Sequence, residues 1–412
     1  MIRLESFRLA LCLVLLLTSL PFPVLASGEG VELDVSAANI EVVESSSDYL
    51  FGEEISFTLR ATSGAEIDSV YLFLRAGAAR EARSIELAIE PSTQVELRYV
   101  RDLRQFPLPP FSTVEYWWEV TDSLGERFVT EPQQFEYLDN RLPWEERSEG
   151  PITVHWTEGD GAFGQTALDV TSASLAEVNR ELRAPLPTSI DVYLYGSYAN
   201  LSEAMDRAGR DWVQGEAHPE LGAIVVAIPP GDGYTSRMKR LIPHELTHLL
   251  VYEAVSPEGY PYVPEWLDEG LATANERVPL PEYQVTLEEA LAEGRLIPLR
   301  ELCHPFSPDQ NDNLLSYAQS ASVVSYLRED YGASTIRDLL AAYADGAGCE
   351  GGVRQVLGKG LDGLGVAWQA SLEPEAPWHA VADRLGVWVA LWVLSLAVAV
   401  PMLGSLRQLS RR

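Results

Sequence analysis

Hydrophobic residues alternate with polar ones in the first third of the chain, which indicates strands with one buried face. The alternation covers residues 30–140, where turn residues separate the short apolar runs. Many short strands over about a hundred residues predict an all-β sandwich domain. The clearest alternating sets are Ile55, Phe57 and Leu59; Val70, Leu72 and Leu74; and Val114, Tyr116, Trp118 and Val120.

Residues 150–372 combine strand and helix patterns and predict a second, α+β domain. The polar residues 140–150 are interpreted as a linker to it. Strands are expected at Ile152–Trp156, Ile190–Tyr195 and Leu221–Ile228, and a helix at Thr166–Leu182. From Thr235 onward the pattern is helical, with helices expected over 235–254, 264–276, 284–294, 314–331, 333–344, 350–357 and 362–372.

Both ends of the chain carry targeting signals. Residues 1–26 combine early arginines, an apolar run and small residues up to Ala26, which is typical of a cleaved secretory signal peptide. Residues 385–406 form a charge-free apolar run long enough to span a bilayer, preceded by a linker at 373–384. Because arginines dominate the tail at 407–412, we expect that tail in the cytoplasm. The prediction is a single-pass type I protein of the cell membrane with its domains extracytoplasmic.

The chain is strongly acidic, with 61 acidic and 30 basic residues and a formal net charge of -31. Nucleic acid is excluded as a partner because phosphate binding needs a basic surface. The charge fits a solubility role, and a salt-adapted host is the alternative. Removal of the signal peptide leaves Cys303 and Cys349, which are expected to form a disulfide in an oxidising compartment.

One short motif carries metal chemistry, the segment His244-Glu245-Leu246-Thr247-His248. Four-residue spacing puts both imidazoles on one face of a helix, where they can bind one zinc ion. Glu245 lies beside them as the expected general base for a zinc-bound water. Apolar neighbours from Met238 to Val251 indicate a buried helix, in which two imidazoles and a carboxylate need polar partners.

A catalytic zinc ion of this kind needs a third protein ligand. The candidate is Glu269, twenty-one positions after His248 in the segment Pro264–Ala272, which reads PEWLDEGLA. Glu265 and Asp268 are the competing carboxylates. Either is equally suited to the first turn of a helix, where the helix dipole favours a negative charge.

HELTH followed by WLDEG resembles the gluzincin branch of zinc metallopeptidases, with the thermolysin-like and M1-like fold. The similarity is greatest to the M1-related peptidase MA-like group and covers residues 150–372. It implies that His244, His248 and Glu269 bind one zinc ion and that peptide bonds are the substrate. More weakly, Tyr116–Gly125 resembles the late strand and turn of an immunoglobulin or fibronectin type III-like domain.

The resemblance also implies an oxyanion-stabilising residue on a later helix. Tyr317, in the segment Tyr317-Ala318-Gln319-Ser320, is similar to the family's YAQS segment. An ordinary packing role in the helical core is equally compatible with Tyr317. His304 and Tyr326 are further candidates.

Three places where the sequence matches the family pattern or departs from it bear on the expected activity. Gly222–Val226 stands where M1 aminopeptidases carry a GxMEN segment for the substrate's amino group, so an endopeptidase is preferred. Thr273 stands where thermolysin-like enzymes place a His-orienting aspartate. The strand Leu221–Ile228 matches the family's substrate-pairing edge strand. A catalytically inactive binding or adhesion module with this fold is the alternative function.

Overall fold

The computed structural model describes residues 39–77, 79, 81–205, 214–306 and 310–372. The expected signal peptide (1–26) lies outside these ranges, and so do the expected linker, membrane span and basic tail (373–412). Within the described ranges, the helices are all too short or too polar to cross a bilayer.

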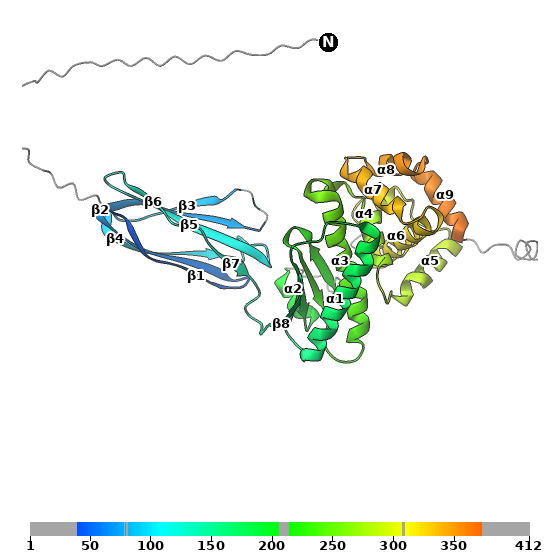
Figure 1. Cartoon of the computed structure of the whole chain (residues 1–412), viewed down its shortest axis with the longest axis horizontal. Helices are drawn as coiled ribbons and strands as arrows, with labels where there is room; N and C mark the ends of the chain where they lie inside the picture. Colours follow the sequence, from blue (N-terminus) through cyan, green and yellow to red (C-terminus); the bar gives the residue numbers. More distant parts are fainter. Residues whose placement is uncertain (1–38, 78, 80, 206–213, 307–309, 373–412) are drawn as a thin grey trace, which may run out of the picture.

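The N-terminal part is built from antiparallel strands (Figure 1). The three alternating sets found in the sequence are buried, as expected, but the first two lie on one long strand, β2, which changes register between Thr62 and Ser69. The strands are β1 (Glu41–Leu50), β2 (Glu54–Ala76), β3 (Arg83–Leu87), β4 (Ser92–Asp102), β5 (Ser112–Asp122), β6 (Arg127–Val129) and β7 (Gln133–Tyr137).

The expected sandwich is formed from one continuous hydrogen-bonded sheet of seven strands rather than two separate sheets. The first half of β2 pairs with β1 and β4, and its second half pairs with β3 and β5. Contacts between strands that do not pair show that the halves face each other. The Trp118 Nε1 donates to Ser45 Oγ at 3.1 Å, and the rings of Phe57 and Tyr116 lie 4.9 Å apart. The long strand therefore serves both layers.

A second sheet follows with the order β11-β12-β10-β9-β8. The expected strands at 152–156 and 190–195 are confirmed, and two predictions are wrong. Residues 145–149 are strand β8 rather than linker, and β12 is internal rather than at the edge. The strands are β8 (Glu145–Glu149), β9 (Ile152–Trp156), β10 (Ile190–Tyr195), β11 (Gly215–His218) and β12 (Ala223–Ala227), of which β9, β10 and β12 are mutually parallel.

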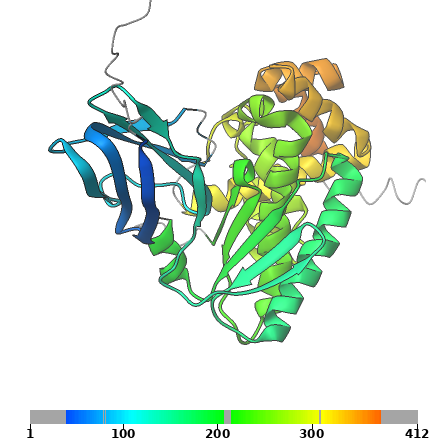
Figure 2. The same ribbon diagram turned by 60° about the vertical axis from the view of Figure 1, so that its left-hand side comes forward.

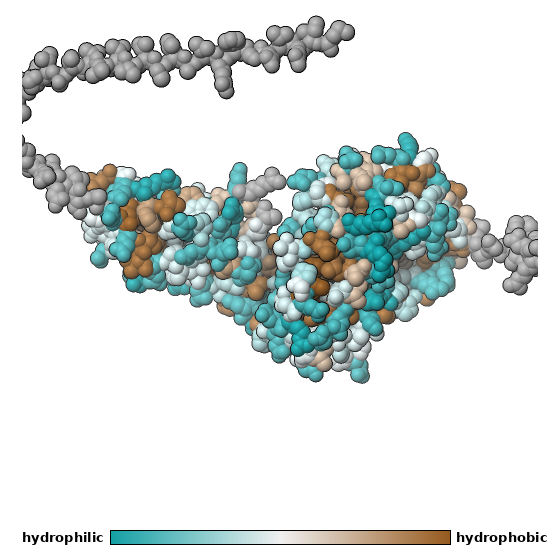
Figure 3. Space-filling model, viewed as in Figure 1, coloured by the Kyte–Doolittle hydropathy of each residue, from teal (hydrophilic) through white to brown (hydrophobic). Residues whose placement is uncertain are grey.

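Except for α2, the helices match the sequence pattern closely and lie on one face of this sheet (Figure 2). Leu201 and Ala204 of α2 pack instead with the β-domain core on the other face. Ile190, Val192 and Leu194 point into a core shared with α1 and α3. Hydrophilic residues cover the exposed side of α1 (Figure 3). The helices are α1 (Gly161–Leu182), α2 (Tyr198–Ala204), α3 (Tyr234–Gly259), α4 (Glu265–Ala274), α5 (Pro281–Glu293), α6 (Gln310–Asp330), α7 (Ser334–Ala344), α8 (Cys349–Leu357) and α9 (Leu361–Leu372).

The opposite face of the second sheet is covered by the β-domain. Tyr193 and Tyr195 join the β-domain core, and the Tyr193 ring lies 4.3 Å from that of Phe111. The Tyr195 hydroxyl donates to Asp139 Oδ2 at 3.2 Å, and Arg141 pairs with the same carboxylate. Because alternate residues of one strand enter two cores, the strand reads as a continuous apolar run. The β-domain thus completes the burial of the second sheet.

The expected disulfide between Cys303 and Cys349 is present and joins the start of α8 to the 3₁₀ turn at Glu301–Cys303. It closes a loop with a sequence separation of 46 residues. Replacing both cysteines with serine should lower the free energy of unfolding by about 4 kcal/mol, because the unfolded chain regains loop entropy. Urea unfolding of the unreduced protein measures this difference. Wild-type protein treated with dithiothreitol should match the double variant, and equal stability of reduced and oxidised wild type would contradict the prediction.

Candidate metal centre

Helix α3 presents both histidines on one face. The rings of His244 and His248 lie 5.3 Å apart, and their side chains are only 13% and 10% exposed. Leu246, Leu249 and Leu250 are buried on the other side of the helix, in the core shared with the sheet. The amphipathic pattern of the helix therefore sets the direction in which the imidazoles point.

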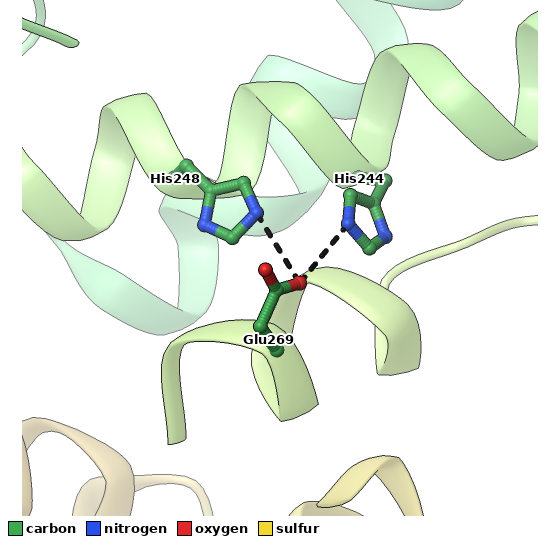
Figure 4. Close-up of side chains that lie close together, drawn as sticks. All are labelled: His244, His248 and Glu269. Atoms are coloured by element: carbon green, nitrogen blue, oxygen red, sulfur yellow. Dashed lines mark ion pairs between the residues drawn. The ribbon is translucent and has the colours of Figure 1, made fainter. Parts of the chain in front are cut away.

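Helix α4 brings Glu269 against the two imidazoles (Figure 4). Its Oε2 lies 3.3 Å from His244 Nε2 and 3.6 Å from His248 Nε2. One ligand atom from each of the three residues falls within 4.8 Å of the others. Glu265 and Asp268, the competing carboxylates, are outside this cluster.

A close approach between α4 and α6 holds Glu269 in place. A Cβ on Gly270 would lie 2.7 Å from the backbone oxygen of Ser320, so only glycine permits this packing. The same stretch of α6 carries Tyr317, whose ring lies 6.1 Å from that of His244. The glycine of the WLDEG segment therefore brings the third ligand and Tyr317 toward the same centre.

Two further carboxylates orient the imidazoles, and sequence reasoning did not give them this role. Glu276 Oε1 lies 3.2 Å from His244 Nδ1, and Asp268 Oδ1 lies 3.1 Å from His248 Nδ1. These contacts direct each Nε2 toward Glu269, as carboxylates behind zinc-bound histidines do. Thr273, which stands at the position of the family's orienting aspartate, makes no hydrogen bond with its buried Oγ1. The signal for Asp268 was its place beside Glu269.

Tyrosine hydroxyls hold both orienting carboxylates. The Tyr260 hydroxyl donates to Asp268 Oδ2 at 2.7 Å, and the Tyr283 hydroxyl donates to Glu276 Oε1 at 3.4 Å. Each imidazole thus contacts a carboxylate that is itself held by a tyrosine hydroxyl. Burial and the neighbouring carboxylate raise the pKa of both tyrosines, so the hydroxyls stay protonated and remain donors.

Pro243 explains how Glu276 reaches His244. A proline within a helix cannot donate to the carbonyl four residues earlier, which here is Lys239. That oxygen instead accepts a hydrogen bond from the Arg277 N–H at 2.9 Å. The residue next to Glu276 is therefore tied to α3, one turn before His244.

The charges of this centre fit a bound cation. Burial lowers the pKa of His244, but hydrogen bonds to Glu269 and Glu276 outweigh it and raise that pKa to about 10. Burial raises the pKa of Glu269, and the two histidines pull it well below its usual range. The buried Glu269 Oε2 faces both Nε2 atoms, at 3.3 and 3.6 Å. Two imidazole nitrogens and a carboxylate oxygen are the ligand set of a catalytic zinc ion, so these residues fit zinc.

Glu245 lies beside Gly215, the first residue of the edge strand β11. A Cβ on Gly215 would lie 2.3 Å from Glu245 Oε1, so this glycine lets the strand approach the carboxylate. Glu245 is 7% exposed and lines a cleft of about 730 Å³ together with His244, His248 and Tyr317. The strand beside the centre is thus β11, and not the expected segment 221–228.

The three candidates for the oxyanion-stabilising residue lie in different places. Tyr317 lines this cleft, and burial followed by Glu269 and Glu245 raises its pKa. Tyr326 lies on the later part of α6 and packs against Tyr331, which follows the helix. His304 is exposed just after the 3₁₀ turn Glu301–Cys303. Tyr317 is therefore the candidate that faces the centre.

The orienting role of Glu276 has a direct test. Changing Glu276 to glutamine should weaken zinc retention by about 10- to 100-fold, because the neutral amide holds His244 less firmly. Competition with a chelator of known affinity measures this change. Glu282→Gln, at an exposed position at the start of α5, is the matched control and should retain zinc like wild type. Equal retention by both variants would contradict the role of Glu276.

The chain is similar to one known protein family and to several solved structures. Residues 170–374, about half of the chain, match the family model of the Peptidase MA superfamily. An M1 zinc metallopeptidase from Deinococcus radiodurans is similar at 16% identity, over 81% of this chain and 95% of that one, with a TM-score of 0.40. An aminopeptidase N family protein from Idiomarina loihiensis is similar at 11% identity, over 80% of this chain and 72% of that one, with a TM-score of 0.32.

No curated protein matches the sequence. The family match begins within α1 and includes α3, α4 and α6, so all the residues of the metal centre lie inside it. It also includes the disulfide between Cys303 and Cys349. Through this segment, the chain belongs to the Peptidase MA superfamily of metallopeptidases.

Proposed function

We propose that the protein hydrolyses peptide bonds with one zinc ion held by His244, His248 and Glu269. The observation that carries the proposal is the convergence of these three side chains next to Glu245, at the edge of a sheet. When bound, zinc lowers the pKa of a coordinated water and polarises the substrate carbonyl. A purely structural site would not need a carboxylate and an open cleft beside it.

Glu245 is placed to act as the general base. Its buried carboxylate borders the cleft and accepts the proton of the attacking water. The same group then delivers that proton to the leaving nitrogen. The backbone at Gly215 lies close against this carboxylate, since a Cβ there would lie 2.3 Å from Glu245 Oε1.

Tyr317 is placed to stabilise the oxyanion. Its raised pKa keeps the hydroxyl protonated, so it remains a hydrogen-bond donor at neutral pH. It faces the cleft near His244, where the substrate carbonyl approaches. A donor at this position stabilises the tetrahedral intermediate more than the ground state.

Strand β11 is placed to bind the substrate backbone. In the second sheet it pairs with β12 on one side, and its other side borders the cleft at Gly215, Glu216 and Ala217. An extended peptide can add to such an edge as a further strand. This strand carries the substrate-pairing role that the sequence assigned to 221–228.

The extent of the cleft, rather than the segment 222–226, supports an endopeptidase. The segment 222–226 lies on the neighbouring strand, so its lack of an amino-binding motif no longer bears on the activity. The cleft continues on both sides of Glu245, through cavities of about 730 and 250 Å³, which leaves room for chain in both directions. Glu216 and Glu265 on the larger side favour a second candidate, an aminopeptidase, because carboxylates attract a free amino group.

The location is proposed from the ends of the chain. Residues 1–26 and 385–406 support a protein anchored in the cell membrane with its catalytic part extracytoplasmic. The disulfide supports the same location, since such bonds persist in oxidising compartments.

Glu245→Gln tests the catalytic role. The variant should keep its zinc but lose at least about 100-fold in kcat/KM, because no carboxylate accepts the proton. Internally quenched peptides with blocked and with free amino ends serve as substrates, and zinc content is measured in parallel. Cleavage of blocked peptides separates an endopeptidase from an aminopeptidase. If the variant cleaves like wild type, Glu245 is not the general base, and if neither protein cleaves, the inactive binding module is the better account.

A further inference from the structure

A cavity of about 250 Å³ opens beside Glu245, on the side away from Glu216 and Glu265. Its walls come from α3, the start of β11, the segment 276–283 that leads into α5, and the beginning of α6. The side chains that define its character are Arg240, Leu241, Leu280, Tyr283, Asn313 and Leu314.

Most of this wall is apolar, and the cavity has the size of a side chain. Leucines from α3, from the residue before α5 and from α6 surround it together with the ring of Tyr283. A dry apolar cavity of about 150 Å³ holds a benzene molecule, so this one accommodates an aromatic ring. Because Glu245 and Tyr317 also line it, a side chain in this cavity belongs to a residue next to the bond that is cut.

One polar group in the wall is left without a partner. Asn313 is only 5% exposed, and its buried Oδ1 makes no hydrogen bond. Buried polar atoms are nearly always paired, so this amide is suited to a group that the ligand brings. A hydroxyl pairs with the amide whichever way it is turned, because it donates to Oδ1 and accepts from Nδ2.

The charges around the cavity select against ionised side chains. Arg240 borders it, and its guanidinium donates to Gln214 Oε1 at 2.6 Å, so a cationic side chain is repelled. Glu245 and Glu276 border it as well and repel an anionic side chain. An aromatic ring that ends in a neutral hydroxyl meets the shape, the charge and the unpaired amide together.

We propose that this cavity is a specificity subsite for a tyrosine side chain of the substrate, with the phenol hydroxyl bound by Asn313. The inference rests on the proposed peptidase function and adds the substrate class to it. Phenylalanine fits the same space but leaves the amide unpaired. Sites built to hydrogen bond a hydroxyl discriminate strongly against analogues that lack it.

Peptides that differ only in the residue before or after the cleaved bond test this. Wild-type protein should cleave the tyrosine peptide with a kcat/KM at least about tenfold above that of the phenylalanine peptide. Asn313→Leu should reduce this ratio to one or below while cleavage of the phenylalanine peptide continues. Circular dichroism confirms that the variant is folded.

A second pair of variants tests the space itself. Leu280→Trp fills the cavity and should lower kcat/KM for tyrosine and phenylalanine peptides by about tenfold or more, and leave that for an alanine peptide nearly unchanged. Val285→Trp introduces the same side chain at a 52% exposed position on α5 and should change none of them. Equal losses on all peptides with Leu280→Trp would overturn the subsite.

A binding measurement separates this inference from the proposed function. Calorimetry with p-cresol and with toluene needs no catalysis. Wild type should bind p-cresol more tightly, and Asn313→Leu should reverse the order. Peptide cleavage without a tyrosine preference would overturn the subsite alone. Tighter p-cresol binding without any peptide cleavage would overturn the peptidase proposal and leave the pocket standing as a phenol site.

Discussion

The site depends on one constraint, which is that several carboxylates are buried close together among the helices. Glu245, Asp268, Glu269 and Glu276 lie around two imidazoles, and apolar side chains of α3 pack behind them. Buried carboxylates at this density are costly unless a cation balances them. Protons on the two histidines balance part of the charge, as the raised pKa of His244 shows. A divalent ion held by the two Nε2 atoms and Glu269 would take the place of those protons and balance the same charge.

The surrounding fold is arranged to keep this centre rigid. Pro243 releases the Lys239 carbonyl to bind the backbone beyond α4, and Gly270 lets α4 lie against α6. The β-domain contributes from a distance by burying the outer face of the second sheet. That sheet positions β11, whose Gly215 approaches Glu245. Each element near the reaction centre is thus held by contacts that do not involve the substrate.

Much of this arrangement could be predicted from the sequence because helical periodicity and short motifs are local signals. The helices from α3 to α9 and the disulfide followed from periodicity, spacing and residue type, and the convergence of His244 with Glu269 followed from the family resemblance of HELTH and WLDEG. The edge strand did not, since β11 has only four residues and none of them is fully buried. Strand β8 lies at the end of the sheet and pairs on one side only, so its residues are polar and mostly exposed. A short polar run of this kind cannot be told from a linker in the sequence. Glu276 lies beyond the end of α4, where its reach depends on a backbone contact to α3 that periodicity does not reveal.

Titration of zinc into the metal-stripped protein tests the central claim most directly. Bound zinc and peptidase activity are followed together in wild type and in His248→Ala. We expect activity to rise in proportion to zinc and to stop rising at about one equivalent, with neither binding nor activity in the variant. Full activity of the metal-stripped protein, or tight zinc binding that persists in His248→Ala, would contradict the account.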